Sequence, residues 1–403
     1  MFGAFNTFGK LGSPAGGKTL LAQILAMQPS FVGIPSVTGG YQDSAGTTAL
    51  TQPGGGSADP PVGKALDLSG LGNHAIQATS TARPKLSARK NLLTKTEDFS
   101  TSWATPATFT ANSAIAPDGS TTAAVSVFTS SGQLYFGGFA LGPSIQSVWV
   151  RSDIPVDIDF GAYDASGFGA SFERKSVTPT WTRISTANAS AFSNSGDRHA
   201  CMFSANYGAC TLEIWHPQLE LGSTATTYQR VTDASNYDYS GFPLYWKFNG
   251  VESALATGTV TAGTFGSNTD VFLAVRRNTP ANVGLVYSSD DTSMLIGLAQ
   301  SGSSAACVNN AGAPTVFVNG GQLAGGGGVT RDTLHAALAV GQWNILEVRN
   351  ADMSLWAKVA FGNWLGGYQL DGGLGGGIIV PAQSDANRAV IRRYLAQRVG
   401  VTL

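Results

Sequence analysis

The chain has 403 residues, of which 12% are charged and 51 are glycine, and its formal net charge at pH 7 is -1. Such a chain lacks the surplus of Lys and Arg that broad binding to nucleic acid or to an anionic membrane requires. Hydrophobic residues make up 43%, which is enough apolar surface for a folded rather than a disordered protein. Low charge together with abundant glycine is typical of many short strands joined by tight turns.

Other bulk features exclude further classes. The three cysteines, Cys201, Cys210 and Cys307, are too few for a disulfide framework and lack the CxxC spacing of a zinc site. No run of 18 apolar residues predicts a transmembrane helix, and the first residues lack the pattern of a signal peptide. We therefore expect a protein that stays in the cytoplasm until a larger assembly carries it out.

Residues 1–40 differ from the rest of the chain. Leu20, Ile24 and Met27 recur at helical spacing before Pro29, which predicts a short amphipathic helix. Because so short a helix is not stable alone, we expect residues 1–40 to form an anchoring or oligomerisation arm. Residues 12–19 also match the Walker A pattern, but no α/β alternation surrounds them, so no nucleotide cofactor is predicted.

Two segments that lie far apart in the sequence complete one pattern. The first, Leu66–Ala75, contains the Asp-x-Ser-Gly-x-Gly-Asn-x-Ala turn, and the second comprises Phe248–Leu255 and Val271–Arg276. They resemble the opening of the concanavalin-like, laminin-G-type sandwiches of bacteriophage proteins, in which these elements follow one another directly. The resemblance implies a sandwich domain of residues 41–89 plus 235–403, interrupted at a surface loop.

The intervening segment has its own opening and closing motifs. It begins with Asn91-Leu92-Leu93 and Glu97-Asp98-Phe99-Ser100, and ends with Trp215, Gln218-Leu219-Glu220 and Tyr228. These motifs resemble those of jelly-roll modules, related to carbohydrate-binding modules, in structural proteins of tailed bacteriophages. The resemblance implies that residues 90–231 are an inserted jelly-roll domain and that the chain is a virion protein.

The rest of the interrupted sandwich domain, which we call the outer domain, is predicted to form short strands and a terminal helix. Apolar runs separated by Gly, Asn and Asp predict strands, and residues 325–328 predict a Gly-rich loop. Helical spacing predicts a helix over Asp385–Val399, with Arg388, Arg392 and Arg393 exposed and Gly400 as C-cap. The fold class is therefore all-β: a jelly roll inserted into a concanavalin-like sandwich, with an N-terminal arm and a C-terminal helix. The predicted strands are Val283–Tyr287, Met294–Leu298, Thr315–Val318, Trp343–Val348 and Leu355–Val359.

Aromatic side chains of the inserted domain are the candidate binding residues. Sugars stack on aromatic rings, and a few polar groups bond their hydroxyls. Since most aromatics of a sandwich fill its core, each candidate has a structural alternative, and we expect Trp215, within the closing motif, to be a core residue. The candidate carbohydrate-binding residues are Tyr135, Tyr163, Phe168 and Trp181, and Phe136 and Trp149 are further aromatics of the same domain.

The sequence offers little for catalysis. Asp157 and Asp159 share a strand face, but no Glu completes the motif of a retaining glycoside hydrolase. The four histidines are scattered and no HExxH motif occurs, so no catalytic residue and no resident cofactor are predicted. The sequence leaves open a structural calcium site, for which Asp118, Asp290 and Asp291 are candidate ligands.

The leading hypothesis is a non-enzymatic phage virion protein, a head fibre, decoration or tail-associated protein, that adheres to host-surface polysaccharide. Its partners would be capsid, portal or tail proteins, and by analogy with fibres it would form a homo-oligomer, specifically a trimer. It would have no nucleic acid or membrane partner. A purely architectural protein without ligand is the second hypothesis, and a glycan-cleaving enzyme is the third.

Overall fold

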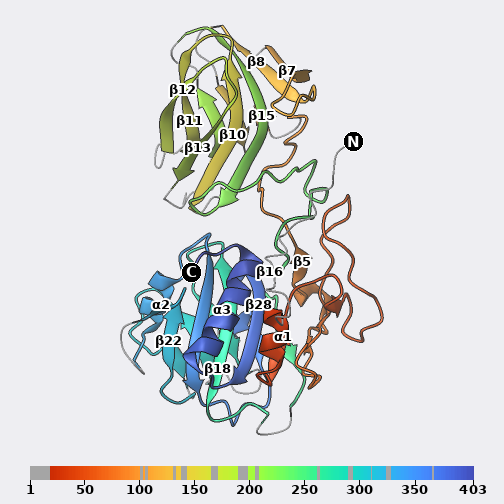
Figure 1. Ribbon diagram of the computed structural model, residues 1–403, viewed down its shortest axis with the longest axis vertical. Helices are drawn as coiled ribbons and strands as arrows, with labels where there is room; N and C mark the ends of the chain where they lie inside the picture. The colour runs from red at the N-terminus through yellow and green to blue at the C-terminus, as the bar shows by residue number, and fades with distance from the viewer. Residues whose placement is uncertain are drawn as a thin grey trace. The chain divides into compact units, whose positions relative to one another are not determined.

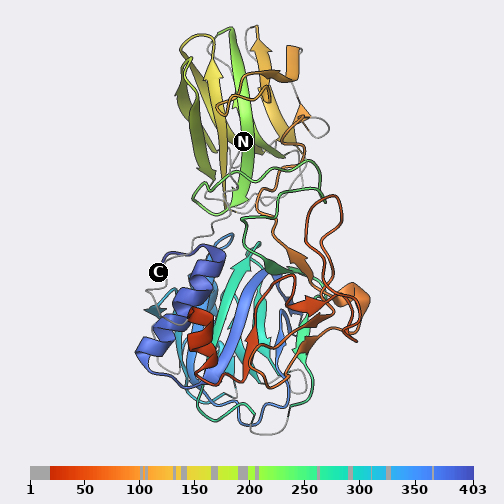
Figure 2. The same cartoon turned by 45° about the vertical axis from the view of Figure 1, so that its right-hand side comes forward.

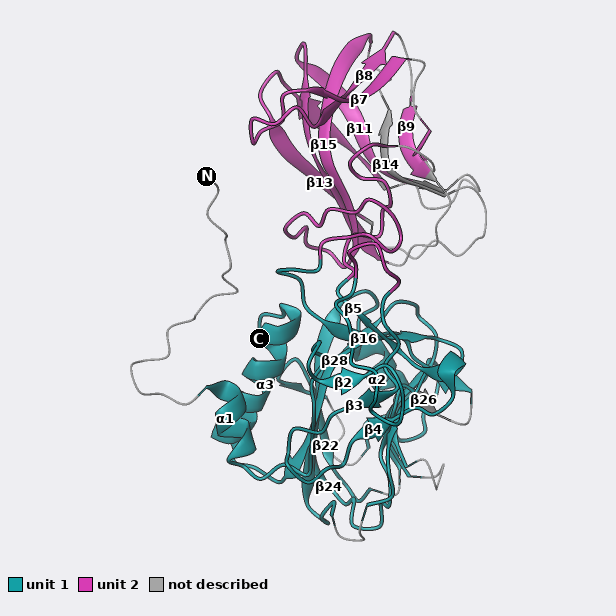
Figure 3. Cartoon of the chain, turned by 90° about the vertical axis from the view of Figure 1, so that its right-hand side faces the viewer, with its two compact units in different colours: residues 1–53, 59–88, 239–403 teal, residues 54–58, 89–238 magenta. Residues whose placement is uncertain are grey.

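The structure is a computed structural model, and the chain divides into two compact units (Figure 3). Unit 1 comprises residues 1–53, 59–88 and 239–403, and unit 2 comprises residues 54–58 and 89–238. Sequence reasoning placed the inserted domain at 90–231. The structure describes residues 19–403 except 100–102, 105–107, 130–132, 138–142, 165–170, 189–197, 205–207, 261–263, 289–293, 310, 324–327 and 365–366.

Unit 1 is a sandwich of two antiparallel sheets around one apolar core. The first sheet has the order β23 (Gly321–Gln322), β22 (Thr315–Val318), β24 (Trp343–Ala351), β18 (Thr269–Arg277), β28 (Asp371–Pro381), β16 (Tyr245–Asn249) and β5 (Lys85–Ser87), and β1 (Phe31–Gly33) also pairs with β28. The second has the order β2 (Gly40–Tyr41), β3 (Lys64–Ala65), β4 (Ala75–Ile76), β17 (Leu255–Thr257), β25 (Ala360–Phe361), β19 (Val283–Tyr287), β20 (Leu295–Ala299) and β21 (Val308–Asn309).

Shorter elements complete unit 1. The strands β26 (Asn363–Trp364) and β27 (Tyr368–Gln369) form a separate pair, Ser80–Ala82 is a 3-10 turn, and α2 (Arg331–Ala337) is a short helix. Arg277 lies buried at the end of α2, where its guanidinium donates to the carbonyls of His335 and Leu338. Burial lowers the pKa of Arg277 to about 10, and the helix C-terminus is a favourable place for its charge.

The strands on either side of the insertion pair with each other. β5 is the last strand before unit 2 and β16 the first after it, and Leu86 lies opposite Trp246. Both residues are buried in the core of unit 1. Unit 2 therefore takes the place of the loop that would connect an antiparallel hairpin.

The C-terminal helix α3 (Asp385–Val399) covers the outer face of the first sheet (Figure 1). It begins at the N-cap Ser384, whose hydroxyl accepts from Asn387 N, and ends at Gly400, which has a φ of 72°. Both ends agree with the predicted helix. Ile391, Leu395 and Val399 pack with apolar residues of β18, β24 and β28.

The arginines of α3 differ from the prediction, because only Arg393 is exposed. Arg388 Nε lies 2.8 Å from Oδ2 of Asp270 on β18, and Arg392 Nη1 lies 2.6 Å from Oε2 of Glu347 on β24. Both carboxylates are completely buried. Buried carboxylates need charged partners, and the arginines fill this role and fix α3 on the sheet.

The described part of the predicted N-terminal arm, residues 19–40, belongs to unit 1. The helix α1 (Leu20–Leu25) buries Ile24 against the apolar side of α3 (Figure 2), and Phe31 on β1 lies opposite Ile379 on β28. This segment therefore completes the outer layer of unit 1 instead of forming a separate arm. Residues 1–18 lie outside the described residues, and their anchoring role stays a prediction.

The Asp-x-Ser-Gly-x-Gly-Asn-x-Ala motif of unit 1 is a structural turn. Oδ1 of Asp67 accepts from Val32 N at 2.9 Å, and Oδ2 accepts from Asn73 N at 3.0 Å. Gly70 and Gly72 have positive φ angles of 89° and 75°, which glycine adopts without strain. The motif thereby ties β1 to the chain that follows β3.

Leu355–Val359, predicted as a strand, is a turn and an irregular segment. Oδ1 of Asp352 accepts from Ser354 N at 3.0 Å, and Trp356 N donates to the carbonyl of Met353 at 3.0 Å. These local bonds compete with a strand ladder. The apolar pattern instead reflects burial of Trp356 and Val359. The predicted loop at 325–328 lies largely outside the described residues.

Unit 2 is a sandwich of two five-stranded antiparallel sheets. Its first sheet has the order β13 (Thr182–Asn188), β10 (Ser144–Ser152), β15 (Cys210–Leu221), β8 (Ala123–Phe128) and β7 (Thr108–Ala114). The second has the order β12 (Ser171–Val177), β11 (Val156–Asp164), β14 (Arg198–Ser204), β9 (Gln133–Gly137) and β6 (Trp103–Ala104). Apolar residues of both sheets form one core, so the predicted all-β class is confirmed.

The opening and closing motifs of unit 2 meet in a buried amide network. Asn91 Oδ1 accepts from Leu219 N, and its Nδ2 donates to the carbonyls of Pro217 and Gln229, all at 3.1 Å. Gln229 Oε1 in turn accepts from Asn91 N at 2.9 Å, and Gln218 Oε1 accepts from Gln229 N at 2.7 Å. Because all three amide side chains are fully buried, the network joins the two chain ends of unit 2.

We expect Arg388→Met to destabilise unit 1 by about 3–5 kcal/mol, because it leaves the buried carboxylate of Asp270 without its charged partner. The midpoint of the unit 1 transition in urea measures the loss. Arg393→Met is the matched control on the exposed side of the same helix, and it should change stability by less than about 0.5 kcal/mol. Equal midpoints for the two variants would contradict this role of Arg388.

Candidate functional site

The structure describes the side chains of two of the four predicted binding residues, Tyr135 and Trp181, and these two lie on different sheets of unit 2. Tyr135, on β9, and Tyr163, on β11, belong to the second sheet of unit 2, and Trp181 directly precedes β13 of the first. Tyr135 is partly exposed, whereas only the backbone of Tyr163 is described. Phe168 lies outside the described residues. Of the further aromatics, Phe136 is 5% exposed and belongs to the core.

Three tryptophans instead gather on the outer face of the first sheet. Trp149 on β10 lies opposite Trp215 on β15, and directly opposite residues of an antiparallel pair share a face. Their neighbours Val150 and Ile214 point into the core and are completely buried. Trp149, Trp181 and Trp215 are each partly exposed, and we call them the tryptophan face.

The expectation that Trp215 is a core residue is therefore wrong. β15 alternates inward and outward up to Ile214, which places Trp215 outward, and the indole Nε1 donates to Thr122 Oγ1 at 3.0 Å. The register between β10 and β15 shifts between Ser147 and Trp149. The pairing of Trp149 with Trp215 depends on the register between two strands that are far apart in the chain, and a single sequence does not reveal it.

Two arginines and a glutamate lie beside the rings of the tryptophan face. The Arg151 guanidinium lies 5.1 Å from the centroid of the Trp181 ring, and its Nε and Nη2 donate to Glu213 Oε2 at 2.9 and 2.7 Å. The ion pair holds the guanidinium against the ring, which limits the motion of both side chains. Arg183 lies opposite Trp149 and donates to Ser147 Oγ at 2.8 Å.

A stack of three rings extends the face beyond Trp215. The His216 imidazole lies between the rings of Trp215 and Tyr228, with centroid distances of 3.3 and 3.7 Å. His216 has a positive φ of 54°, an uncommon conformation that places its ring directly against its neighbour in the chain. The hydroxyl of Tyr228 bonds the Glu97 carboxylate and the Thr96 hydroxyl, which fixes the outer ring.

Burial controls the ionisation of this stack. Burial of the imidazole lowers the pKa of His216 to about 3, with Asp118 opposing and Arg183 supporting the shift. Burial and the nearby Glu97 raise the pKa of Tyr228 well above its ordinary value. At neutral pH both rings are therefore uncharged, and the stack offers no proton donor or acceptor tuned for acid-base catalysis.

Other candidate ligands and carboxylates do not form a reaction centre among the residues that the structure describes. Asp157 lies on the outer face of β11, where Oδ1 accepts from Ser176 Oγ at 2.6 Å. Asp118 accepts from Ser120 N and Oγ in a turn. Asp290 and Asp291 lie outside the described residues. Within the described ranges, no group of three or more His, Cys, Asp or Glu side chains forms a metal site.

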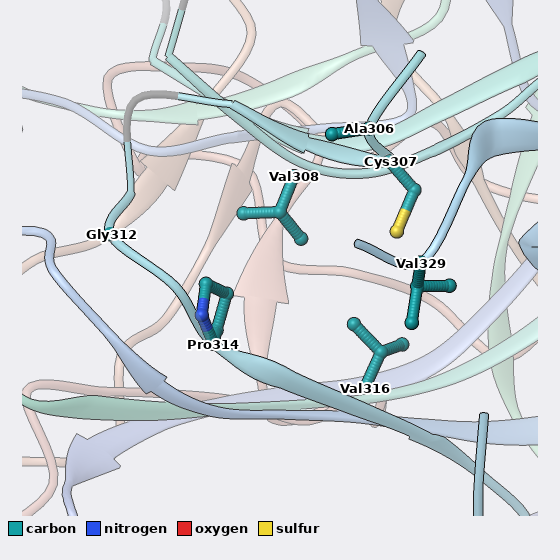
Figure 4. Close-up of a pocket in the computed structure, with 7 residues that line it drawn as sticks. All are labelled: Ala306, Cys307, Val308, Gly312, Pro314, Val316 and Val329. Carbon is teal, nitrogen blue, oxygen red and sulfur yellow. The ribbon is translucent and has the colours of Figure 1, made fainter. Parts of the chain in front are cut away.

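A small pocket in unit 1 holds a buried thiol (Figure 4). Val308, Val316 and Val329 surround the sulfur of Cys307. Burial raises the pKa of the Cys307 thiol to about 12, so the nucleophilic thiolate is absent at neutral pH. The pocket is a packing gap of the core rather than a reactive site.

None of the helices that the structure describes is long and apolar enough to cross a bilayer.

No family model matches the chain, and no curated protein matches its sequence. Among solved structures, it is similar to the CBM22-1 xylan-binding domain of Xyn10C from Paenibacillus barcinonensis, with 13% identity over 35% of this chain and 97% of that chain, and a TM-score of 0.26. It is also similar to the tandem CBM51 modules of the family 98 glycoside hydrolase Sp3GH98 from Streptococcus pneumoniae SP3-BS71, with 8% identity over 67% and 87% of the two chains and a TM-score of 0.19. Both TM-scores are low, so these likenesses carry no argument about this chain.

We expect unit 2 to lose stability as the pH falls from 6.5 towards 3. In this window the unfolded chain binds a proton at His216 and the folded chain does not, which costs at most about 1.4 kcal/mol per pH unit. NMR titration of the His216 ring should show a midpoint near 3. His216→Asn, which tolerates a positive φ, should weaken the pH dependence, and a midpoint near 6.5 would contradict burial of the ring.

Proposed function

We propose that the chain is a carbohydrate-binding protein and that the tryptophan face of unit 2 holds the glycan. The observation that carries this proposal is the position of Trp149, Trp181 and Trp215, partly exposed on one sheet face whose other side supplies the core. Aromatic rings bind the C–H faces of sugars. The nearby guanidinium and carboxylate groups of Arg151, Arg183 and Glu213 supply bonds to hydroxyls.

The energetics of folding support a binding role for these rings. Complete burial of a large apolar side chain stabilises a protein by roughly 1.5–3 kcal/mol. Because the three tryptophans of unit 2 are partly exposed, unit 2 loses part of this stabilisation at each of them. Gathered exposed apolar surface is typical of interaction sites. The ion pair of Arg151 with Glu213 orders the face in advance, which reduces the entropy lost on binding.

We further propose that the protein belongs to a phage virion and contacts host-surface polysaccharide. This part rests on the opening and closing motifs, from Asn91 to Tyr228, which resemble those of tailed-phage structural proteins. Residues 1–18 would attach the chain to capsid, portal or tail proteins, and a homo-oligomer, such as the trimer typical of fibres, would present several copies of unit 2. Avidity from several copies would compensate for weak binding at each site.

Glycan binding is tested with the full chain on a glycan array and by affinity electrophoresis on the polysaccharides found. Trp149→Ala and Trp181→Ala should each weaken binding at least about tenfold, because each removes a stacking platform. Tyr135→Ala is the matched control, since Tyr135 is a partly exposed aromatic of the other sheet. Thermal unfolding verifies that each variant is folded.

The outcomes separate the alternatives. Loss of binding in Tyr135→Ala alone would move the site to the second sheet and overturn the tryptophan face. Absence of any glycan binding would favour the purely architectural hypothesis. Release of reducing sugar that is lost in Asp157→Asn would favour the glycan-cleaving enzyme.

The virion assignment has its own test. Tailed particles from the source of this sequence, purified on a density gradient, should contain the chain by mass spectrometry, and removal of residues 1–18 should abolish its incorporation. A chain found only in the soluble fraction would contradict the virion assignment and leave the glycan-binding proposal standing.

A further inference from the structure

A row of cations crosses the outer face of the first sheet of unit 1. Arg276 on β18 lies opposite Trp343 on β24 and opposite Gly373 on β28. Gly373 lies opposite Lys247 on β16, which lies opposite Lys85 on β5. Because directly opposite residues share a face, these side chains lie on one side of the sheet, and we call Arg276, Lys247 and Lys85 the cation row.

The row lies on the same face as α3 but beyond the end of that helix. Val399, the last residue of α3, packs over Gly375, two residues along β28 from Gly373. The other face of the same strands carries the core residues Trp246 and Leu374. Lys85 and Lys247 are exposed and Arg276 is partly exposed, so solvent reaches the row.

Two aromatic rings hold Arg276 in place. Its guanidinium carbon lies 4.9 Å from the centroid of the Tyr245 ring and 5.0 Å from that of Trp343. Gly373 permits this arrangement, because a Cβ at that position would lie 2.8 Å from atoms of both rings. The guanidinium is therefore ordered before any ligand arrives.

None of the three cations of the row forms an ion pair with a described residue, although the carboxylate of Asp371 lies on the same face. Within the described residues no acceptor bonds the Arg276 guanidinium, and its Nε is buried without a partner. On the same face, Oδ1 of Asp371 accepts from Asn278 Nδ2 at 3.1 Å. An ordered guanidinium with free donors is a binding group for a planar anion, and carboxylate matches its fork in two parallel bonds.

We propose that the cation row of unit 1 binds the carboxylates of an acidic polysaccharide, with Arg276 as the specific contact and Lys247 and Lys85 as further charges along the same polyanion. The inference goes beyond the tryptophan face, because it concerns the other unit and a charged class of ligand. Strand spacing places Lys247 roughly 10 Å from Arg276 and Lys85 roughly 5 Å further. The row thus suits an extended chain with repeated charges.

Charge favours a polysaccharide over nucleic acid. Strong binding to phosphate backbones requires many cations, whereas the whole chain has a formal net charge of -1 and the row holds three cations. The two rings beside Arg276 also offer apolar surface for the C–H groups of a sugar.

The experiment uses the full chain and two forms of one polymer, polygalacturonate and its fully methyl-esterified form, in affinity electrophoresis and calorimetry. Polygalacturonate should bind and the neutral form should bind at least about tenfold more weakly. Arg276→Gln should lower the affinity for polygalacturonate at least about tenfold, and the matched control Arg393→Gln, an exposed arginine of α3, should leave it unchanged.

A second variant avoids any effect of Arg276 on folding. Lys85→Gln with Lys247→Gln changes only exposed side chains, and it should weaken polygalacturonate binding severalfold and reduce its salt dependence. Neutral glycans that bind the tryptophan face should bind this double variant as they bind the unmodified chain, which separates the two sites. Three results would overturn the proposal. They are equal affinity for the two forms of the polymer, unchanged polygalacturonate binding in both variants, and tighter binding of duplex DNA than of polygalacturonate.

Discussion

The buried side-chain amide of Asn91 connects the first residues of unit 2 to its last, and the rest of the chain path depends on this connection. An amide inside a sandwich must bond through both its oxygen and its nitrogen, because each unpaired buried group costs about 1–3 kcal/mol. Asn91 bonds the carbonyls of Pro217 and Gln229, so residues 89–238 of unit 2 begin and end close together. Unit 1 can then pair β5 with β16 across the insertion.

In unit 1, buried carboxylates fix the position of α3 on the first sheet. Asp270 and Glu347 are completely buried on neighbouring strands, and both turn towards arginines of α3. The helix is thereby fixed in position along the sheet, since a shift of one turn would break both of these ion pairs. The helix ends at Val399, over Gly375, and Arg276 lies beyond this end between two rings.

Sequence reasoning predicted those elements whose local pattern and tertiary role agree. The strands Val283–Tyr287 and Thr315–Val318 and the helix Asp385–Val399 have the predicted bounds. It missed features that depend on pairing across strands. Trp149 and Trp215 share a face because their strands pair in this register, and the partner of Arg151 is 62 residues away. For the site, Trp149 and Trp181 could be named from the sequence as aromatics, but neither their common face nor the cation row could be derived without the strand register.

The pairing of β5 with β16 gives the insertion point a definite architecture. Ser87 and Tyr245 lie opposite each other, which is the geometry that two strands have on either side of a hairpin turn. Within unit 2, Arg89 bonds the carbonyls of Asp233 and Ala234, so the segments at the two ends of its chain lie together. Residues 89–238 are therefore an exchangeable insertion: a short turn can replace them, and so can any module whose ends lie equally close. Recombination at this hairpin would exchange residues 89–238 without altering a single strand of unit 1.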